Sequence, residues 1–262
     1  MDQRFAGVTD DMDAGSRREA VIVGRGSSIR TARIPYGIPL IAVSSGVFAC
    51  PRKPRYFVTL DSVKYFYHPP IITAPGAWSK DPNCTWWDFL SDPSVEKWVP
   101  DGKASGFYRE WPRSGHHDTL DIEEAMLLLG HTRPDLTGWQ AGWDEHPSLR
   151  TYAWKQGAGP NFDATGPIGS GGYPTHKSIL AAVQIAHRLG FERLYFAGVD
   201  LHSGKWEYSL NALKEWQAIA QARGFEWLNL STGSTLTEFM RTEESDADHD
   251  DMAGRQQTCA RQ

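Results

Sequence analysis

The sequence is poor in cysteine and lacks long apolar runs, and each absence excludes a class of protein. Its three cysteines, Cys50, Cys84 and Cys259, form no C-x-x-C pair and no metal-ligand spacing. We therefore expect free thiols in a reducing compartment rather than a disulfide framework or a zinc finger. No apolar run approaches the ~20 residues that span a bilayer. Residues 1–15 are polar and acidic, unlike a secretory signal, so we expect a cytoplasmic protein with no membrane span.

A strong charge excess is also missing from the body of the chain. The formal net charge is −5, but six acidic residues fall between positions 243 and 251, so the rest of the chain carries a charge of +1. Such a body gives no sign of a large basic field that would steer it to nucleic acid, although a local basic patch is left open.

The length of 262 residues suits one large domain, or one domain with a sizeable insertion. We expect a flexible N-terminal tail at 1–18, a single Rossmann-like nucleotide-binding domain at 19–241 and an acidic disordered tail at 242–262. Residues 75–165 hold eight of the eleven tryptophans and are broken by proline and glycine. They are predicted to form an irregular Trp-rich insertion. Insertions of this kind often form a lid or a binding wall, although most of the tryptophans are expected to fill a secondary core.

Short apolar segments alternate with small polar loops, which is typical of an α/β protein with a mostly parallel sheet and helices on both faces. The predicted strands cover 20–23, 39–43, 55–60, 149–154, 194–198 and 225–230. Helices are predicted over 179–189, where apolar residues recur at three- and four-residue spacing before Gly190, and over 207–223. A short closing helix is expected around Leu236 and Phe239.

Small or polar residues stand where many of these segments end, and the carboxyl ends of parallel strands meet at one sheet edge. The loops are Gly24–Ser28, Ser44–Gly46, Asp61, Ser170–Gly172 with Asp200–His202, and Ser231–Ser234. Loop amides suit a phosphate, a carboxylate suits ribose hydroxyls, and Ser27 or Ser28 would cap a following helix. The sequence thus predicts a nucleotide cleft. A tight turn without a ligand stays open for the first loop, because Ile29 replaces the last glycine of G-x-G-x-x-G.

The order of these motifs resembles glycosyltransferase family 42, the bacterial sialyltransferases, and the related motility-accessory-factor type glycosyltransferases. The segment Gly24-Arg-Gly-Ser-Ser-Ile29 is similar to the family's G-N-G-P-S-L. Ser170-Gly171 resembles its Ser-Gly loop, and Leu194-Tyr-Phe-Ala-Gly-Val-Asp200 resembles its I-Y-L-x-G-I-D strand. A weaker echo of P-N-S-L-L lies at 232–236. The likeness covers roughly 20–62 and 168–240.

This resemblance implies a variant of the GT-A, Rossmann-like fold and a glycosyltransferase that uses a nucleotide-sugar donor, CMP- or UDP-linked, without a metal or other cofactor. The donor contacts that it implies, together with the polar residues at the same sheet edge, are Gly24, Arg25, Gly26, Ser28, Ser44, Asp61, Ser170, Gly171 and Asp200. The family's catalytic base is a histidine that follows the Gly-Ile-Asp strand, and His202 is the nearest match. Arg25 and Ser44 stand where the family has asparagines, so the donor's identity stays open.

Glycosyl transfer needs a base for the acceptor hydroxyl and a stabilised leaving phosphate. A histidine such as His202 supplies the first, and Arg25 or loop amides supply the second. One alternative is an ATP- and magnesium-dependent phosphotransferase similar to archaeal pterin diphosphokinases, in which Asp61 would bind the metal and the phosphates. Another is a non-catalytic binding or assembly protein on a degenerate transferase fold. The sequence indicates neither the acceptor nor the oligomeric state.

Overall fold

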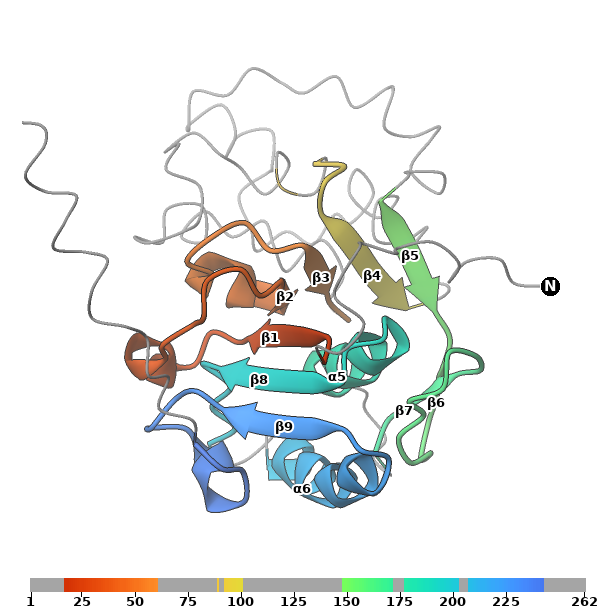
Figure 1. Cartoon of the computed structure of the whole chain (residues 1–262). Coiled ribbons are helices and arrows are strands. Elements are labelled where there is room, and N and C mark those ends of the chain that lie inside the picture. Colours follow the sequence, from red (N-terminus) through yellow and green to blue (C-terminus); the bar gives the residue numbers. More distant parts are fainter. Residues whose placement is uncertain are drawn as a thin grey trace, which may run out of the picture.

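A seven-stranded parallel sheet forms the centre of the molecule (Figure 1). The computed structural model describes residues 17–60, 89, 92–100, 148–171, 177–202 and 207–242. The strands of this sheet are β1 (Glu19–Val23), β2 (Leu40–Val43), β3 (Tyr56–Val58), β4 (Glu96–Pro100), β5 (Leu149–Tyr152), β8 (Arg193–Ala197) and β9 (Glu226–Asn229). All neighbouring pairs are parallel. The predicted α/β class with a mostly parallel sheet is confirmed.

The strand order reverses direction at β1. The order is β5-β4-β3-β2-β1-β8-β9, so β2 to β5 extend the sheet on one side of β1 and β8 and β9 on the other. In an open α/β sheet, ligands bind outside the carboxyl ends of the strands at such a switch point. The loops that follow β1 and β8 therefore mark the place where a ligand is expected.

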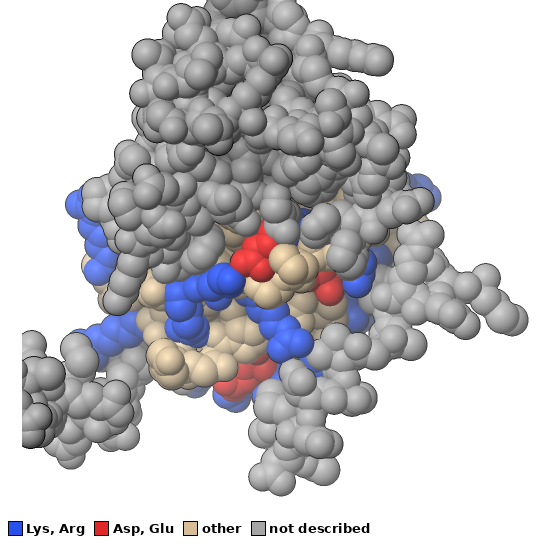
Figure 2. Space-filling view, turned by 90° about the horizontal axis from the view of Figure 1, so that it is seen from above, with Lys and Arg blue, Asp and Glu red and all other residues tan. Residues whose placement is uncertain are grey.

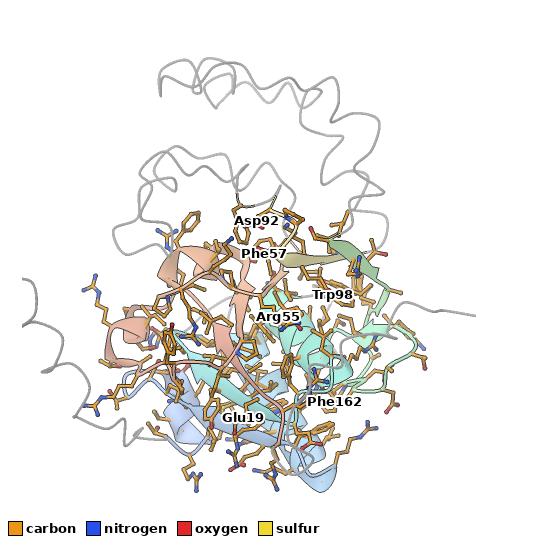
Figure 3. All side chains as sticks on the ribbon, turned by 45° about the horizontal axis from the view of Figure 1, so that its top comes forward. Glu19, Arg55, Phe57, Asp92, Trp98 and Phe162 are labelled. Atoms are coloured by element: carbon orange, nitrogen blue, oxygen red, sulfur yellow. The ribbon has the colours of Figure 1, made fainter. Side chains whose placement is uncertain are left out.

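The two faces of the sheet have different covers. Helices α5 (Ser178–Arg188) and α6 (Glu207–Ala222) share one buried cluster with Ile22 of β1, whereas Val21 belongs to the cluster on the other face. Phe57 and Trp98, labelled in Figure 3, likewise belong to different clusters.

The second face carries short 3₁₀ helices, η1 (Ser27–Thr31) and η2 (Ser44–Ala49), in the ranges that the structure describes. Helices are therefore present on both faces, as predicted: α5 and α6 cover one face, and the 3₁₀ helices η1 and η2 lie on the other. Glycines and prolines just before η1 and between η1 and η2 interrupt any longer helix here: Gly24, Gly26, Pro35, Gly37 and Pro39.

The helix α5 lies where it was predicted, but residues 179–187 are all buried, so the helix is enclosed on every side rather than on one apolar face. Its end is also as predicted, because Gly190 adopts a φ of +84° just beyond the C-cap residue Leu189. Gln184 is the one buried amide in the helix and it is fully used. Its Oε1 accepts from the backbone N–H groups of Asn161 and Gly169, and its Nε2 donates to the carbonyl oxygens of Gly169 and Leu180.

The region 75–165 contains regular structure that the sequence did not reveal. Strand β4 was not predicted, and the expected strand at 149–154 is divided into β5 and β6 (Trp154–Lys155). Strand β6 pairs with β7 (Ile168–Gly169) in a separate two-stranded sheet. The predicted closing helix is present as η7 (Thr235–Glu238). The tails at 1–16 and 243–262, and most of the Trp-rich insertion, lie outside the described residues.

No helix in the described part of the chain is long and apolar enough to cross a membrane.

Candidate functional site

The loops after β1 and β8 cross in direct contact at the switch point. The N–H of Gly24 donates to the carbonyl oxygen of Ala197 at 2.9 Å, and the N–H of Gly26 donates to that of Gly198 at 2.7 Å. A Cβ on Gly24 would lie 2.4 Å from the Gly198 oxygen, so glycine is required by the neighbouring loop. Gly198 itself has a φ of +64°, which glycine adopts without strain.

The Asp200 carboxylate joins the loop after β8 to the loop after β1 by hydrogen bonds. One carboxylate oxygen, Oδ2, accepts from the backbone N–H of Ser28 at 2.8 Å and from the Ser27 hydroxyl at 3.3 Å. The other oxygen, Oδ1, accepts from the Ser28 hydroxyl. The Asp200 side chain is only 4% exposed. A Cβ on Gly26 would lie 2.3 Å from its Cγ, so the second glycine of the loop makes room for this carboxylate.

This contact changes the expected use of the first loop. The sequence suggested that Ser27 or Ser28 would cap a helix and leave amides free for a phosphate. Instead the N-cap residue of η1 is Gly26, which has no side chain to cap the helix. The backbone N–H of Ser28 donates its hydrogen bond to the Asp200 carboxylate. The Asp200 carboxylate therefore stands at the start of η1, where an anion was expected. Within the described residues, the loop amides that keep no acceptor are those of Arg25 and Ser27.

His202 lies beside this cluster and is open to solvent. Its side chain is 56% exposed, and its Nε2 lies 3.9 Å from Asp200 Oδ2, which is beyond hydrogen-bonding distance. The structure describes one other histidine, His187, which is buried on α5. His202 is thus the described imidazole that a ligand at the switch point could reach.

Arg25 is the exposed cation of the same loop, with its guanidinium carbon 6.0 Å from the centre of the Phe48 ring.

Ser44 follows β2 as the first residue of η2, and it is hydrogen-bonded to α5 and lies beside Thr59 after β3. Its φ is +47°, the one positive value for a non-glycine residue in the described ranges. Its hydroxyl donates to Ser178 Oγ at 3.0 Å and lies 3.2 Å from Thr59 Oγ1. Ser178 Oγ also accepts from the N–H of Leu60 at 3.1 Å. A strained residue held by three elements at the sheet edge is a frequent mark of a functional site.

Ser178 Oγ thus accepts two hydrogen bonds, from the Ser44 hydroxyl and from the N–H of Leu60.

Ser170 and Gly171 take structural positions between the helices. Ser170 is fully buried, and its hydroxyl accepts from the N–H of Gly157 at 2.8 Å. Gly171 has a φ of +73°, and a Cβ there would lie 2.9 Å from the Cβ of Ala212 on α6. Their contact with a donor stays a prediction.

The loop after β9 is hydrogen-bonded to the residues that follow β8. Ser231 Oγ accepts from the N–H of Gly198 at 3.0 Å, and the Ser234 hydroxyl donates to the carbonyl oxygen of Val199 at 2.7 Å. Both serines are buried and hold the residues that follow β8. Asp61 lies outside the described residues.

Three residues at this edge were not singled out as candidates from the sequence. Thr59, Ser178 and Gly198 all contact the expected site residues. Their only sequence signal is position, because each stands at the end of a strand or the start of a helix.

The described residues contain no group of three or more histidine, cysteine, aspartate or glutamate side chains placed to hold a metal ion. The expected independence from metal stays a prediction.

Comparison with known proteins gives structural likeness at low identity. No protein-family model matches the chain, and no curated protein matches it. The Campylobacter jejuni sialyltransferase CstII in complex with cytidine-5′-monophosphate is 10% identical, with a TM-score of 0.43 over 86% of this chain and 84% of that one. The monofunctional α-2,3-sialyltransferase Cst-I from the same organism is 13% identical, with a TM-score of 0.40 over 90% and 83%. The chain is thus similar in outline to these sialyltransferases, and the proposals below rest on its own site.

Proposed function

We propose that the protein is a glycosyltransferase-like enzyme that moves a sugar from a nucleotide-sugar donor to an acceptor, with His202 as the general base. One observation carries the proposal. At the switch point, Asp200 locks the loop after β1 to the loop after β8, and an exposed imidazole stands directly beside that lock. A nucleotide cleft and a base are the two parts that glycosyl transfer requires.

The reaction can be written with these groups in place. An acceptor hydroxyl oxygen forms a bond to the anomeric carbon of the donor sugar as its proton passes to the free ring nitrogen of His202. The bond from the anomeric carbon to the donor phosphate oxygen breaks, and the electron pair leaves with the nucleotide. The exposed Arg25 guanidinium and the amides of Arg25 and Ser27 are the groups of the first loop that can neutralise the departing phosphate.

Asp200 has a different role from the ribose contact that its position suggested. Both of its oxygens already accept hydrogen bonds from Ser27 and Ser28, and the side chain is almost fully buried. We assign it to positioning: it holds the first loop in place and presents a negative charge toward His202. Ser44, with its strained backbone and its link to Ser178, is the better candidate for a donor contact at the β2 end.

A thermal-shift panel with CMP, UDP, GDP and ATP, each with and without Mg²⁺, tests the function. A ligand that binds the folded state raises the melting temperature by mass action. A shift with CMP or UDP in the absence of metal is the expected result. A shift only with ATP and Mg²⁺ would favour the phosphotransferase, and no shift with any nucleotide would favour a non-catalytic binding protein.

Two single variants separate binding from chemistry. His202→Ala should lower the release of free nucleotide from a CMP- or UDP-sugar by about 10²- to 10⁴-fold and leave the thermal shift with that nucleotide intact. Arg25→Ala should reduce the thermal shift itself. Unchanged turnover in His202→Ala would exclude His202 as the base, whatever the outcome of the panel.

A further inference from the structure

The outer surface of the η1–η2 layer carries arginines and an aromatic side chain that the proposed transfer does not use. Ile29, Ala32, Ile34 and Ile38 pack inward against the sheet. The residues between them, Arg30, Arg33 and Tyr36, are exposed. Inward and outward positions therefore alternate along this segment, and the exposed side chains project from the same anchored layer. We call Arg30, Arg33, Tyr36 and Arg52 the arginine face.

The charge of this layer is of one sign. Residues 24–60 contain six arginines and lysines and no aspartate or glutamate. In Figure 2, Lys and Arg side chains lie at the left, the centre and the right of the described surface.

Within the described residues, Arg30 and Arg33 form no ion pair. Other arginines of the described part do pair with carboxylates: Arg17, Arg193 and Arg241 with Glu226, Arg193 also with Glu19, and Arg223 with Asp163. Unpaired, exposed guanidinium groups are suited to bind phosphate oxygens.

Tyr36 gives the face a fixed aromatic platform. It is 94% exposed, far more than any other large apolar side chain in the described ranges. The Arg52 guanidinium lies 5.6 Å from its ring centre. That guanidinium also donates to the carbonyl oxygens of Pro35, at 2.8 Å, and Ile38, so it is tied to both ends of the turn that carries the ring. One face of the ring is therefore backed by a held cation and the other is open.

We propose that the arginine face binds single-stranded nucleic acid. Proteins that bind single strands combine cations for the phosphates with aromatic rings on which bases stack, and both are present here on one rigid layer. A membrane surface fits less well, because a bound face needs several apolar side chains and Tyr36 is the one large apolar side chain that this layer exposes. An acidic protein fits the arginines but gives no use to the held ring.

Fluorescence anisotropy with the full chain and a labelled oligodeoxythymidine of about 15 nucleotides tests the proposal. Binding should weaken steeply between about 50 and 200 mM salt. Tyr36→Ala should reduce affinity by roughly 5- to 150-fold, the equivalent of one lost base stack. Tyr208→Ala, at a 52% exposed tyrosine on α6, is the matched control and should bind as the wild type does.

The cations are tested with a charge-matched pair of double variants. Arg30→Ala with Arg33→Ala should weaken binding and lower the salt slope by roughly one to two units. Arg223→Ala with Arg241→Ala removes the same charge from exposed sites elsewhere and should leave both unchanged. Circular dichroism confirms that each variant is folded.

The proposal is overturned by absence of oligonucleotide binding at low salt, or by a Tyr36→Ala variant that binds like Tyr208→Ala. Equal competition by poly-glutamate would indicate an acidic protein partner instead, and equal binding to anionic vesicles would indicate a membrane surface. None of these variants touches His202 or Arg25, and no sugar donor is present, so failure here is distinct from failure of the proposed transferase.

Discussion

The backbone N–H of Ser28 donates to the carboxylate of Asp200 at 2.8 Å, although 172 positions separate the two residues in the sequence. This bond joins the loop after β1 to the loop after β8, which lie on the two sides of the switch point. Because the same carboxylate also accepts from the hydroxyls of Ser27 and Ser28, the two loops form one unit. A ligand that binds at the carboxyl ends of β1 and β8 would therefore contact two loops that are already held together.

The bond predicts a graded loss of stability at position 200. Asp200→Ala leaves the Ser28 amide without its acceptor in a nearly closed site, so we expect a loss of about 1–3 kcal/mol in the free energy of unfolding. Asp200→Asn keeps one carbonyl oxygen and should lose less. Urea unfolding measures both. Asp163→Ala is the control, because that carboxylate is 68% exposed and its ion pair with Arg223 contributes little. Equal losses in all three variants would contradict this account.

Gly26 should tolerate no side chain. A methyl group there would lie 2.3 Å from Asp200 Cγ, so Gly26→Ala must push the carboxylate away from Ser28 and should destabilise the fold by about 1–3 kcal/mol. Gly159→Ala is the matched control, because a Cβ at that position meets nothing within 4 Å. Thermal unfolding of the two variants gives the comparison. A melting temperature for Gly26→Ala equal to that of Gly159→Ala would show that the loop can rearrange freely.

Local sequence signals were sufficient for most of the sheet. The segments predicted at 20–23 and 39–43 are followed at once by Gly24 and Ser44, and both are strands at almost the predicted bounds. Gly190 predicted the end of α5 because a left-handed residue after a helix favours glycine. Such signals depend only on a few neighbouring residues, so they can be recognised in the sequence before the rest of the fold is known.

The parts that sequence did not predict depend on contacts between distant segments. Strand β4 was missed because Glu96 and Lys97 are charged and Pro100 ends the run, yet Lys97 is fully buried by partners that lie elsewhere in the chain. The glycines of the first loop lie against Gly198 and Asp200, which are more than 170 positions away in the sequence. No local pattern identifies such a neighbour.

His187 should make stability depend on pH between about 4 and 6.5. Its Nε2 accepts from the indole N–H of Trp227 at 2.8 Å, and its Nδ1 lies 2.7 Å from the Phe191 carbonyl oxygen, so the neutral ring carries its proton on Nδ1. Burial lowers the pKa of His187 from 6.5 to about 4, against the opposing effect of the Phe191 hydrogen bond. The unfolded chain therefore binds a proton first as the pH falls, and the stability present above pH 6.5 is lost toward pH 4.

The size of this effect follows from the shift and amounts to at most about 3 kcal/mol in the free energy of unfolding. Urea unfolding from pH 7 to pH 4 measures it. His187→Phe keeps a ring beside Phe225 but cannot be protonated, so it should be less stable at pH 7 and show a shallower decline with acid. A decline parallel to that of the wild type would assign the pH dependence to other groups.

Lys97 should make the free energy of unfolding depend on pH in the alkaline range. Its ammonium group donates to the Asp92 carbonyl oxygen and to Ser148 Oγ, and burial lowers its pKa from 10.5 to about 8, although the Asp92 charge acts against this. Between these two values the unfolded chain holds the proton and the folded chain does not, so this group adds stability as the pH rises from 8 to 10.5. Lys97→Met removes the buried charge and should be neutral or stabilising at pH 7. Its advantage over the wild type should shrink by pH 10, as read from urea unfolding at both values. Lys214→Met, at an exposed position on α6, should show no such change with pH, and the same trend in both variants would exclude Lys97 as its source.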